Sequence, residues 1–153
     1  MHLLLKPALA VSCAVYDTIL VATDGSGPAT RAVTHAIEQA ERNDAELHAI
    51  YVVDTARFAE PALSSAELAT TEMEEWGQQE LDEVAERAES LGIEVLTRSC
   101  HGRPYQEIVE YADAIDADLV VVGYQGHTHS RPDQIGSVAD RVVSNVGRPV
   151  LVT

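Results

Sequence analysis

Short apolar runs alternate with helix-patterned segments along the chain, and this alternation limits the possible folds more than any other feature. The runs are rich in Val, Ile and Leu and lie at 19–22, 47–53, 119–122 and 150–152, and the segment 93–99 alternates apolar and polar residues, as an edge strand does. Between them, apolar residues recur at the spacing of amphipathic helices. Strands that alternate with helical crossovers form a parallel sheet covered by helices on both faces. The sequence therefore predicts a single α/β domain with the order βαβαβαβαβ.

The predicted helices have recognisable start signals. Ser26 can cap the first helix, and Pro28 lies in its first turn. Ser64 and Glu67 have the spacing of a capping box before the second helix, and Pro104 starts the third. The residues predicted to face the core are Val33, Ala36, Ile37 and Ala40, then Met73, Trp76, Gly77, Leu81, Val84, Ala88 and Leu91, then Ile108, Val109, Ala112 and Ile115, and finally Val138, Val142, Val143 and Val146.

The connection between the fourth strand and the last helix is rich in glycine and predicts an anion site. Gly123 and Gly126 follow the strand, and after nine further residues Gly136 and Ser137 lead into the helix. Glycine lets the backbone approach a ligand closely, and the free N–H groups of a first helical turn attract phosphate. The Ser137 hydroxyl can cap the helix or bind a phosphate oxygen. We therefore expect a phosphate group at this connection.

The charge balance excludes some partners and makes a phosphate ligand harder to hold. The chain has 25 acidic and 10 basic residues, a net charge of −15, and Lys6 is its only lysine. Such a protein lacks the basic surface that non-specific binding to nucleic acid or an anionic membrane requires. No segment is long enough to span a bilayer. The repulsion of phosphate would be relieved by Mg²⁺ or by high salt, and an acidic, lysine-poor composition suggests a halophilic protein of a salty cytoplasm.

The N-terminus and the cysteines carry less information. Cys13 and Cys100 form neither a metal-binding spacing nor a disulfide framework, which favours a reducing compartment and partly buried thiols. Residues 1–15 hold one lysine and a short apolar stretch that leads directly into the first strand. We expect an extension outside the core domain, which then spans 16–153. A secretory signal peptide is the alternative.

Three features together resemble the universal stress protein family. They are the aspartate after the first strand, Asp24, the Gly-x2-Gly-x9-Gly-Ser signature that begins at Gly123, and the closing Pro-Val-Leu-Val strand at 149–152. The match runs over about 16–153. The resemblance implies a Rossmann-like three-layer sandwich, of the adenine nucleotide alpha hydrolase type, whose five parallel strands have the order 3-2-1-4-5. In such sheets ligands bind where the strand order reverses, and Asp24 and Gly123 follow the two strands at that point.

The nucleotide-binding branch of the family implies ATP, or another adenine nucleotide, as ligand, with Mg²⁺ on the phosphates. The resemblance places Asp24 against the adenosine and the backbone of Ala22 and Val52 at the edge of the adenine. The residues that it places near the ribose and phosphates are Gly123, Gly126, His127, Gly136, Ser137 and Val138. Independently of the family, an acid at a strand end can bind ribose hydroxyls, although aspartate is also favoured there for shaping the turn.

The loop between Gly126 and Gly136 departs from the family pattern, which is commonly basic and then leucine-rich. Arg131 keeps one cation for a phosphate. Pro132 and Asp133 stand in place of apolar residues, and a carboxylate at this position would repel phosphate unless it bound a metal. These changes bear on the affinity of the site more than on its location.

Other chemistries find less support. The segment 24–30 lacks the third glycine of a dinucleotide fingerprint, since Thr30 stands in its place, and the chain contains no P-loop. His127, His129 and Asp133 could bind a transition metal, but no fourth ligand is evident. His101, before the third helix, reads as a solvent-facing or capping residue. No nucleophile–base pair stands out, so we assign no catalytic residues and expect at most slow ATP hydrolysis.

The leading hypothesis is a cytoplasmic ATP-binding protein of the stress response that acts as a switch or binding module. One alternative is a nucleotide-independent interaction protein of the same fold, with the acidic face of its longest helix, around 72–86, meeting an unidentified protein partner. A metal-dependent nucleotide hydrolase is a further alternative. The resemblance also implies a homodimer, paired through the C-terminal edge strand.

Overall fold

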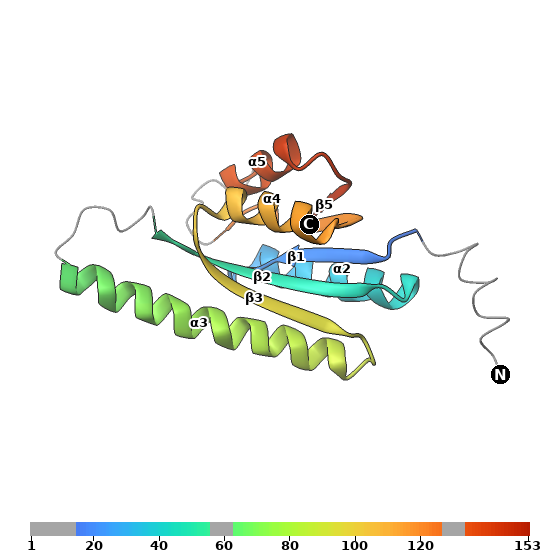
Figure 1. Cartoon of the computed structure of the whole chain (residues 1–153), viewed down its shortest axis with the longest axis horizontal. Coiled ribbons are helices and arrows are strands. Elements are labelled where there is room, and N and C mark those ends of the chain that lie inside the picture. The colour runs from blue at the N-terminus through green and yellow to red at the C-terminus, as the bar shows by residue number, and fades with distance from the viewer. Residues whose placement is uncertain (1–14, 56–62, 127–133) are drawn as a thin grey trace, which may run out of the picture.

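The computed structural model describes residues 15–55, 63–126 and 134–153. Strands and helices alternate as predicted (Figure 1). The elements in chain order are β1 (Thr18–Ala22), α2 (Gly27–Asn43), β2 (Glu46–Asp54), α3 (Leu63–Glu89), β3 (Val95–Gly102), α4 (Pro104–Ile115), β4 (Leu119–Val122), α5 (Ser137–Asn145) and β5 (Val150–Val152). Of the predicted N-terminal extension, only Val15 lies within the described residues.

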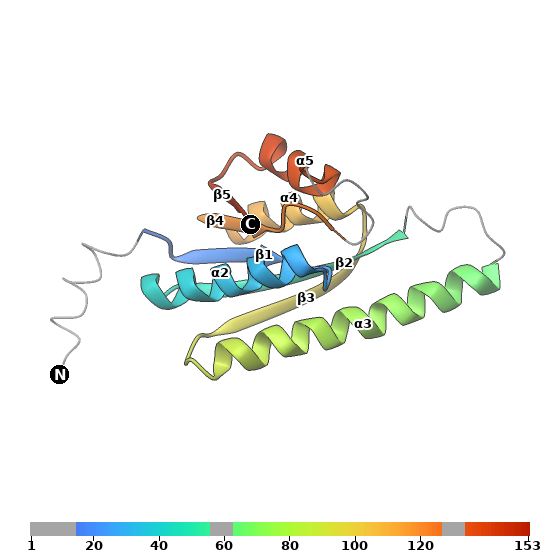
Figure 2. The same ribbon diagram turned by 180° about the vertical axis from the view of Figure 1, so that it is seen from behind.

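All five strands belong to one parallel sheet with the order β3-β2-β1-β4-β5, which confirms the predicted topology. Helices α2 and α3 cover one face of the sheet, and α4 and α5 cover the other (Figures 1 and 2). The chain runs outward from β1 to β2 and β3, then returns through α4 to β4 on the opposite side of β1. The strand order therefore reverses between β1 and β4.

The core lies in two layers, one on each face of the sheet. Side chains of a strand alternate between faces, so Ile19 and Val21 pack toward α2 and α3 whereas Leu20 packs toward α4 and α5. All three side chains are completely buried. Burial on both faces explains why the buried parts of β1 and β4 are continuous apolar runs without polar alternation.

The helix starts agree with the predictions in two cases and differ in a third. Ser26 is the N-cap of α2, where its side chain accepts a hydrogen bond from the Ala29 N–H at 3.3 Å. Pro104 is the first residue of α4. Helix α3 begins at Leu63, so Ser64 lies inside the first turn and not at the cap, contrary to the capping-box prediction.

Several apolar residues predicted to be buried are exposed, because only part of each helix faces the sheet. Leu91 lies beyond the end of α3 and is 52% exposed, and Trp76 is 53% exposed. Successive helical residues are about 100° apart, so burial of Gly77 against β2 turns its neighbour Trp76 away. The same rotation separates buried Val142 from exposed Val143. Val138 is also exposed, at the start of α5, whereas the other predicted inward residues are buried or partly buried.

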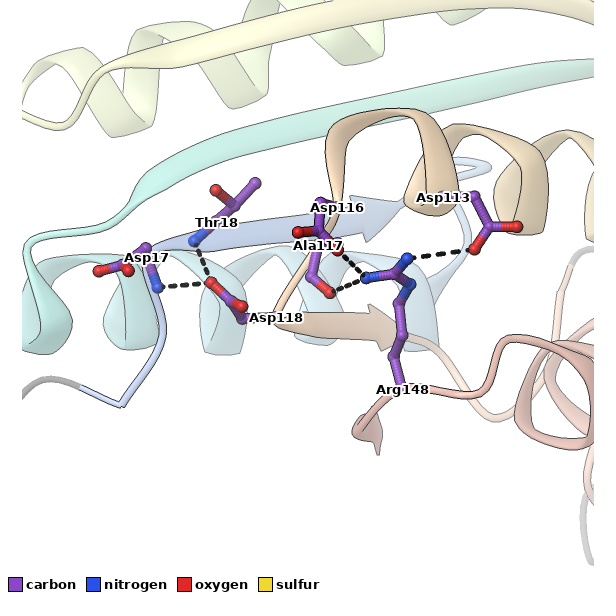
Figure 3. Close-up of polar contacts among 7 residues, drawn as sticks. All are labelled: Asp17, Thr18, Asp113, Asp116, Ala117, Asp118 and Arg148. Carbon is purple, nitrogen blue, oxygen red and sulfur yellow. Dashed lines mark hydrogen bonds and ion pairs between the residues drawn. The ribbon is translucent and has the colours of Figure 1, made fainter.

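Polar contacts fasten the amino ends of β1, β4 and β5 (Figure 3). One Arg148 amino group donates to the Asp116 carboxylate at 3.0 Å and to the Ala117 carbonyl at 2.8 Å, and the other donates to Asp113 at 3.2 Å. Asp118 accepts hydrogen bonds from the backbone N–H groups of Asp17 and Thr18, at 2.8 and 2.9 Å. These contacts lie at the amino ends of the strands. The carboxyl ends, on the opposite side of the sheet, remain available for a site.

Candidate functional site

A cleft with a volume of about 280 Å³ opens at the carboxyl ends of β1, β2 and β4, where the strand order reverses. The ends of these strands and the first turn of α5 form its walls. Small-molecule sites usually measure about 300–1,000 Å³ and, in open α/β sheets, lie at this point of the topology. The cleft is therefore large enough to hold part or all of a small ligand.

Most of the predicted site residues lie together in this cleft. Eight of the nine line it, namely Ala22, Asp24, Val52, Gly123, Gly126, Gly136, Ser137 and Val138. The ninth, His127, lies outside the described residues, as do Arg131 and the possible metal ligands His129 and Asp133. Segments far apart in the sequence thus converge on one place.

Asp24 shapes the turn that leads from β1 into α2. Its Oδ1 accepts a hydrogen bond from the Ser26 N–H at 2.9 Å, and the Thr23 hydroxyl accepts one from the Gly25 N–H at 3.2 Å. Gly25 has a φ of +80°, which glycine adopts without strain. The second carboxylate oxygen, Oδ2, lies toward Gly126, where a Cβ atom would come within 2.6 Å of it. One side chain thus fixes the turn and faces the signature loop.

The signature glycines have packing reasons as well as the predicted role of admitting a ligand. A Cβ atom at Gly123 would lie 2.7 Å from the Pro28 carbonyl carbon and 2.8 Å from the Ala29 nitrogen. The end of β4 therefore packs directly against the first turn of α2. At Gly136, a Cβ atom would lie 3.1 Å from the Tyr124 carbonyl oxygen. The sequence pattern indicates closeness to a ligand, but closeness to the protein's own backbone is evident only from the structure.

The two ends of the signature loop are held together. The Gln125 side-chain amide donates to the Gln134 carbonyl at 2.7 Å, and the Gly136 N–H donates to the Tyr124 carbonyl. The Tyr124 N–H in turn donates to the carbonyl of Thr153, at 2.8 Å. The backbone before 127 and after 133 is therefore anchored at the cleft.

Ser137 does not cap α5, although capping is one of the two uses that the sequence allows for its hydroxyl. Gly136 is the N-cap, and it offers no side-chain acceptor to the first turn. Ser137 is the first helical residue, exposed and at the cleft wall. Of its two predicted uses, contact with a ligand remains. A helix start without a side-chain cap also leaves backbone N–H groups for an anion.

Sequence reasoning missed part of the apolar lining. Ile50 comes from β2, and Met73, Pro104 and Ile108 come from α3 and α4. Ile50 lies in the middle of β2 and pairs in register with Ala22, the last residue of β1, so a rule based on strand ends would not have found it. Met73 could not have been found either, because it depends on α3 packing closely on β2, where a Cβ atom at Gly77 would overlap the Tyr51 ring. Helix α3 also extends beyond the carboxyl end of β2 (Figures 1 and 2).

The charged lining in the described part of the chain is acidic. Asp24 and Asp54 both line the cleft, and no described lysine or arginine does. Asp54 ends β2 as Asp24 follows β1, so the same rule that identified Asp24 would have found it. No group of three or more His, Cys, Asp or Glu side chains among the described residues is placed to hold a metal ion.

The structure agrees with the predictions of a solvent-facing His101 and a partly buried Cys100. His101 is half exposed, as expected for a solvent-facing residue, and its Nε2 lies 2.9 Å from a Glu74 carboxylate oxygen. Cys100 is partly buried, and this burial, reinforced by nearby Glu107, raises the pKa of its thiol. A raised pKa lowers the thiolate fraction, so Cys100 is a poor nucleophile.

Strand order, helical layers and the position of the cleft define a Rossmann-like α/β protein with a cleft at its switch point. The chain belongs to the universal stress protein family, whose model matches residues 15–153. It is 43% identical to universal stress protein MJ0531 of Methanocaldococcus jannaschii over 139 residues. The aligned region covers 90% of this chain and 82% of that protein.

Solved structures agree with this assignment. The structure of protein MJ0577 matches with a TM-score of 0.84 at 24% identity, covering 92% of this chain and 96% of that one, and supports the fold alone. A universal stress protein in complex with cAMP matches with a TM-score of 0.65 at 28% identity, covering 92% and 98% of the two chains. None of the helices in the described ranges combines the length and apolarity needed to cross a membrane.

Proposed function

We propose that this universal stress protein binds an adenine nucleotide, with ATP as the leading ligand, in the cleft at the ends of β1 and β4. The observation that carries the proposal is the convergence of Asp24 and the Gly123–Ser137 signature on one cleft at the switch point of the sheet. A relative solved with cAMP supports an adenine nucleotide as the ligand class.

The lining offers different chemistry for each part of a nucleotide. Ala22, Ile50 and Val52 supply apolar surface for the base. The Asp24 carboxylate is an acceptor for ribose hydroxyls. The uncapped first turn of α5, with the Ser137 hydroxyl and with His127 from the loop, is assigned to the phosphates.

Mg²⁺ is proposed to accompany the phosphates. Carboxylate oxygens are ligands that Mg²⁺ accepts, and Asp24 and Asp54 provide them in the same cleft. A divalent cation would also reduce the repulsion between the phosphates and a chain of net charge −15. A salty cytoplasm would act in the same direction, by screening.

We assign the protein a role as a switch or binding module in the stress response, and at most slow hydrolysis. The described lining holds no histidine, cysteine or lysine that could activate a nucleophile beside Ser137. We also propose a homodimer paired through β5, since this three-residue strand lies at the edge of the sheet and pairs only with β4 among the described strands.

A second candidate is a nucleotide-independent interaction protein that binds its partner through α3. The exposed surface of this helix is acidic at Glu72, Glu75, Glu83 and Glu86, and Trp76 is more than half exposed among them. Such a surface favours a basic partner. This helix face is a separate surface from the cleft, because none of these residues lines the cleft.

Isothermal titration calorimetry with ATP, with and without Mg²⁺ and at low and high salt, tests the leading proposal. We expect saturable binding that is strongest with Mg²⁺. Absence of binding under all four conditions would contradict nucleotide binding and favour the interaction module. Sedimentation at several protein concentrations, with and without ATP, tests the dimer.

A further inference from the structure

The described part of the cleft lacks a cation for a polyphosphate. Its charged side chains are the carboxylates of Asp24 and Asp54. Most described arginines contact other side chains or lie far along their helix from the cleft. Arg148 pairs with Asp113 and Asp116, Arg87 donates to Thr34, Arg98 lies over the Tyr111 ring, and Arg42 is in the last turn of α2.

Arg141 differs from these arginines in its position. It lies on α5 one turn after Ser137, and Ser137 and Val138 both line the cleft. Residues four apart share a helix face, and long helical side chains lean toward the N-terminus of their helix. The Arg141 side chain therefore lies on the side of α5 that continues from the proposed phosphate position.

A tyrosine from the neighbouring helix holds this arginine. The Arg141 guanidinium carbon lies 5.1 Å from the centroid of the Tyr105 ring. Tyr105 follows Pro104, the first residue of α4, which lines the cleft. The guanidinium is thereby kept beside the first turn of α4, whose first residue, Pro104, lines the cleft.

The kind of contact matters, because a ring orients a cation without neutralising it. Arg148 has two carboxylate partners, whereas the contact that Arg141 makes within the described residues is with an aromatic face. Its positive charge thus remains able to attract an anion. The planar guanidinium also matches the paired oxygens of a phosphate group.

We propose that Arg141, positioned by Tyr105, binds the outer phosphates of the nucleotide and makes the cleft prefer ATP over AMP. This inference rests on the proposed function, because it assumes that the base and ribose occupy the cleft. Arg141 is the specificity-determining residue, and Tyr105 is a positioning residue that acts through it.

The test is the ratio of ATP to AMP affinity, measured by titration calorimetry on the full chain. Arg141→Gln should weaken ATP binding by about tenfold or more, the size expected for a hydrogen-bonded charge, while AMP affinity changes less than about twofold. Arg42→Gln removes the same charge at the far end of α2 and should leave both affinities unchanged.

Two tyrosine variants separate positioning from folding. Tyr105→Leu should lower the ATP to AMP ratio by about two- to fivefold, whereas Tyr105→Phe keeps the aromatic face and should keep the ratio. Equal weakening of ATP and AMP in Arg141→Gln, or unchanged ATP binding, would overturn this inference alone. If the unaltered chain binds neither nucleotide, the proposed function fails and the inference fails with it.

Discussion

The Asp24 carboxylate and Gly126 face each other so closely that a Cβ atom at Gly126 would lie 2.6 Å from Asp24 Oδ2. Asp24 has little freedom to retreat, because its Oδ1 accepts the Ser26 N–H at 2.9 Å and so holds the turn before α2. The contact links the end of β1 to the loop after β4, the two strands between which the sheet order reverses.

Gly126→Ala should therefore damage ligand binding more than folding. The added methyl group displaces the Asp24 carboxylate or the loop, and we expect ATP affinity to fall by about tenfold, which corresponds to 1.4 kcal/mol. Gly27→Ala is the matched control, since a Cβ atom there meets only the end of the Arg31 side chain at 4.0 Å. Equal affinities of the two variants would contradict the assignment of Gly126 to the site.

Asp24 carries a structural and a proposed binding role, and two substitutions distinguish them. Asp24→Asn retains an oxygen that can accept the Ser26 N–H but removes the charge, so stability should change little while ATP affinity falls. Asp24→Ala also removes the acceptor and should lower the free energy of unfolding by about 1 kcal/mol. Urea unfolding and calorimetry on both variants measure the two effects. Undiminished ATP binding by Asp24→Asn would leave this residue with its turn role alone.

Substitution of Gly123, unlike that of Gly126, should damage folding more than ligand binding. A Cβ atom at this position would meet backbone atoms of Pro28 and Ala29 at 2.7 and 2.8 Å, and neither can move without shifting the start of α2. We expect Gly123→Ala to lower the free energy of unfolding by about 1–3 kcal/mol, as overpacking does. Thermal and urea unfolding against Gly27→Ala provide the measurement. Unchanged stability would mean that α2 yields easily.

The sheet and the location of the cleft could be predicted because their signals are local in the sequence. The run Leu119–Val122 is uniformly apolar, since β4 is buried on both faces, and the glycines that follow mark the loop. The reversal of strand order then brings Asp24 and Gly123 to the same place. Both facts follow from periodicity and topology, together with the family resemblance.

The remaining details depend on how helices rotate and how closely they approach the sheet. Trp76 fits the apolar spacing of α3 but is exposed, because the helix turns Gly77 toward Tyr51 instead. Met73 reaches the cleft through the same close approach. The pairing of Arg141 with Tyr105 joins α5 to α4, and no spacing along the chain indicates it. Such contacts follow from tertiary packing alone.

Arg148 secures the amino end of β5 through Asp113, Asp116 and the Ala117 carbonyl. The Arg148 side chain is only 20% exposed, whereas the Asp116 side chain is 93% exposed, so we expect the hydrogen bond to Ala117 to contribute more than the ion pairs. Arg148→Ala should lower the free energy of unfolding by about 1–2 kcal/mol. Asp116→Asn should cost less than about 0.5 kcal/mol, because asparagine tolerates the φ of +52° at this position.

A double-mutant cycle between Arg148→Ala and Asp116→Asn measures the pair directly. We expect a coupling energy below about 0.5 kcal/mol, and faster hydrogen exchange at the Thr153 N–H, which bonds the Val122 carbonyl, in the arginine variant alone. A coupling energy above about 1 kcal/mol would show that the exposed ion pair, and not the Ala117 hydrogen bond, holds β5 to the sheet.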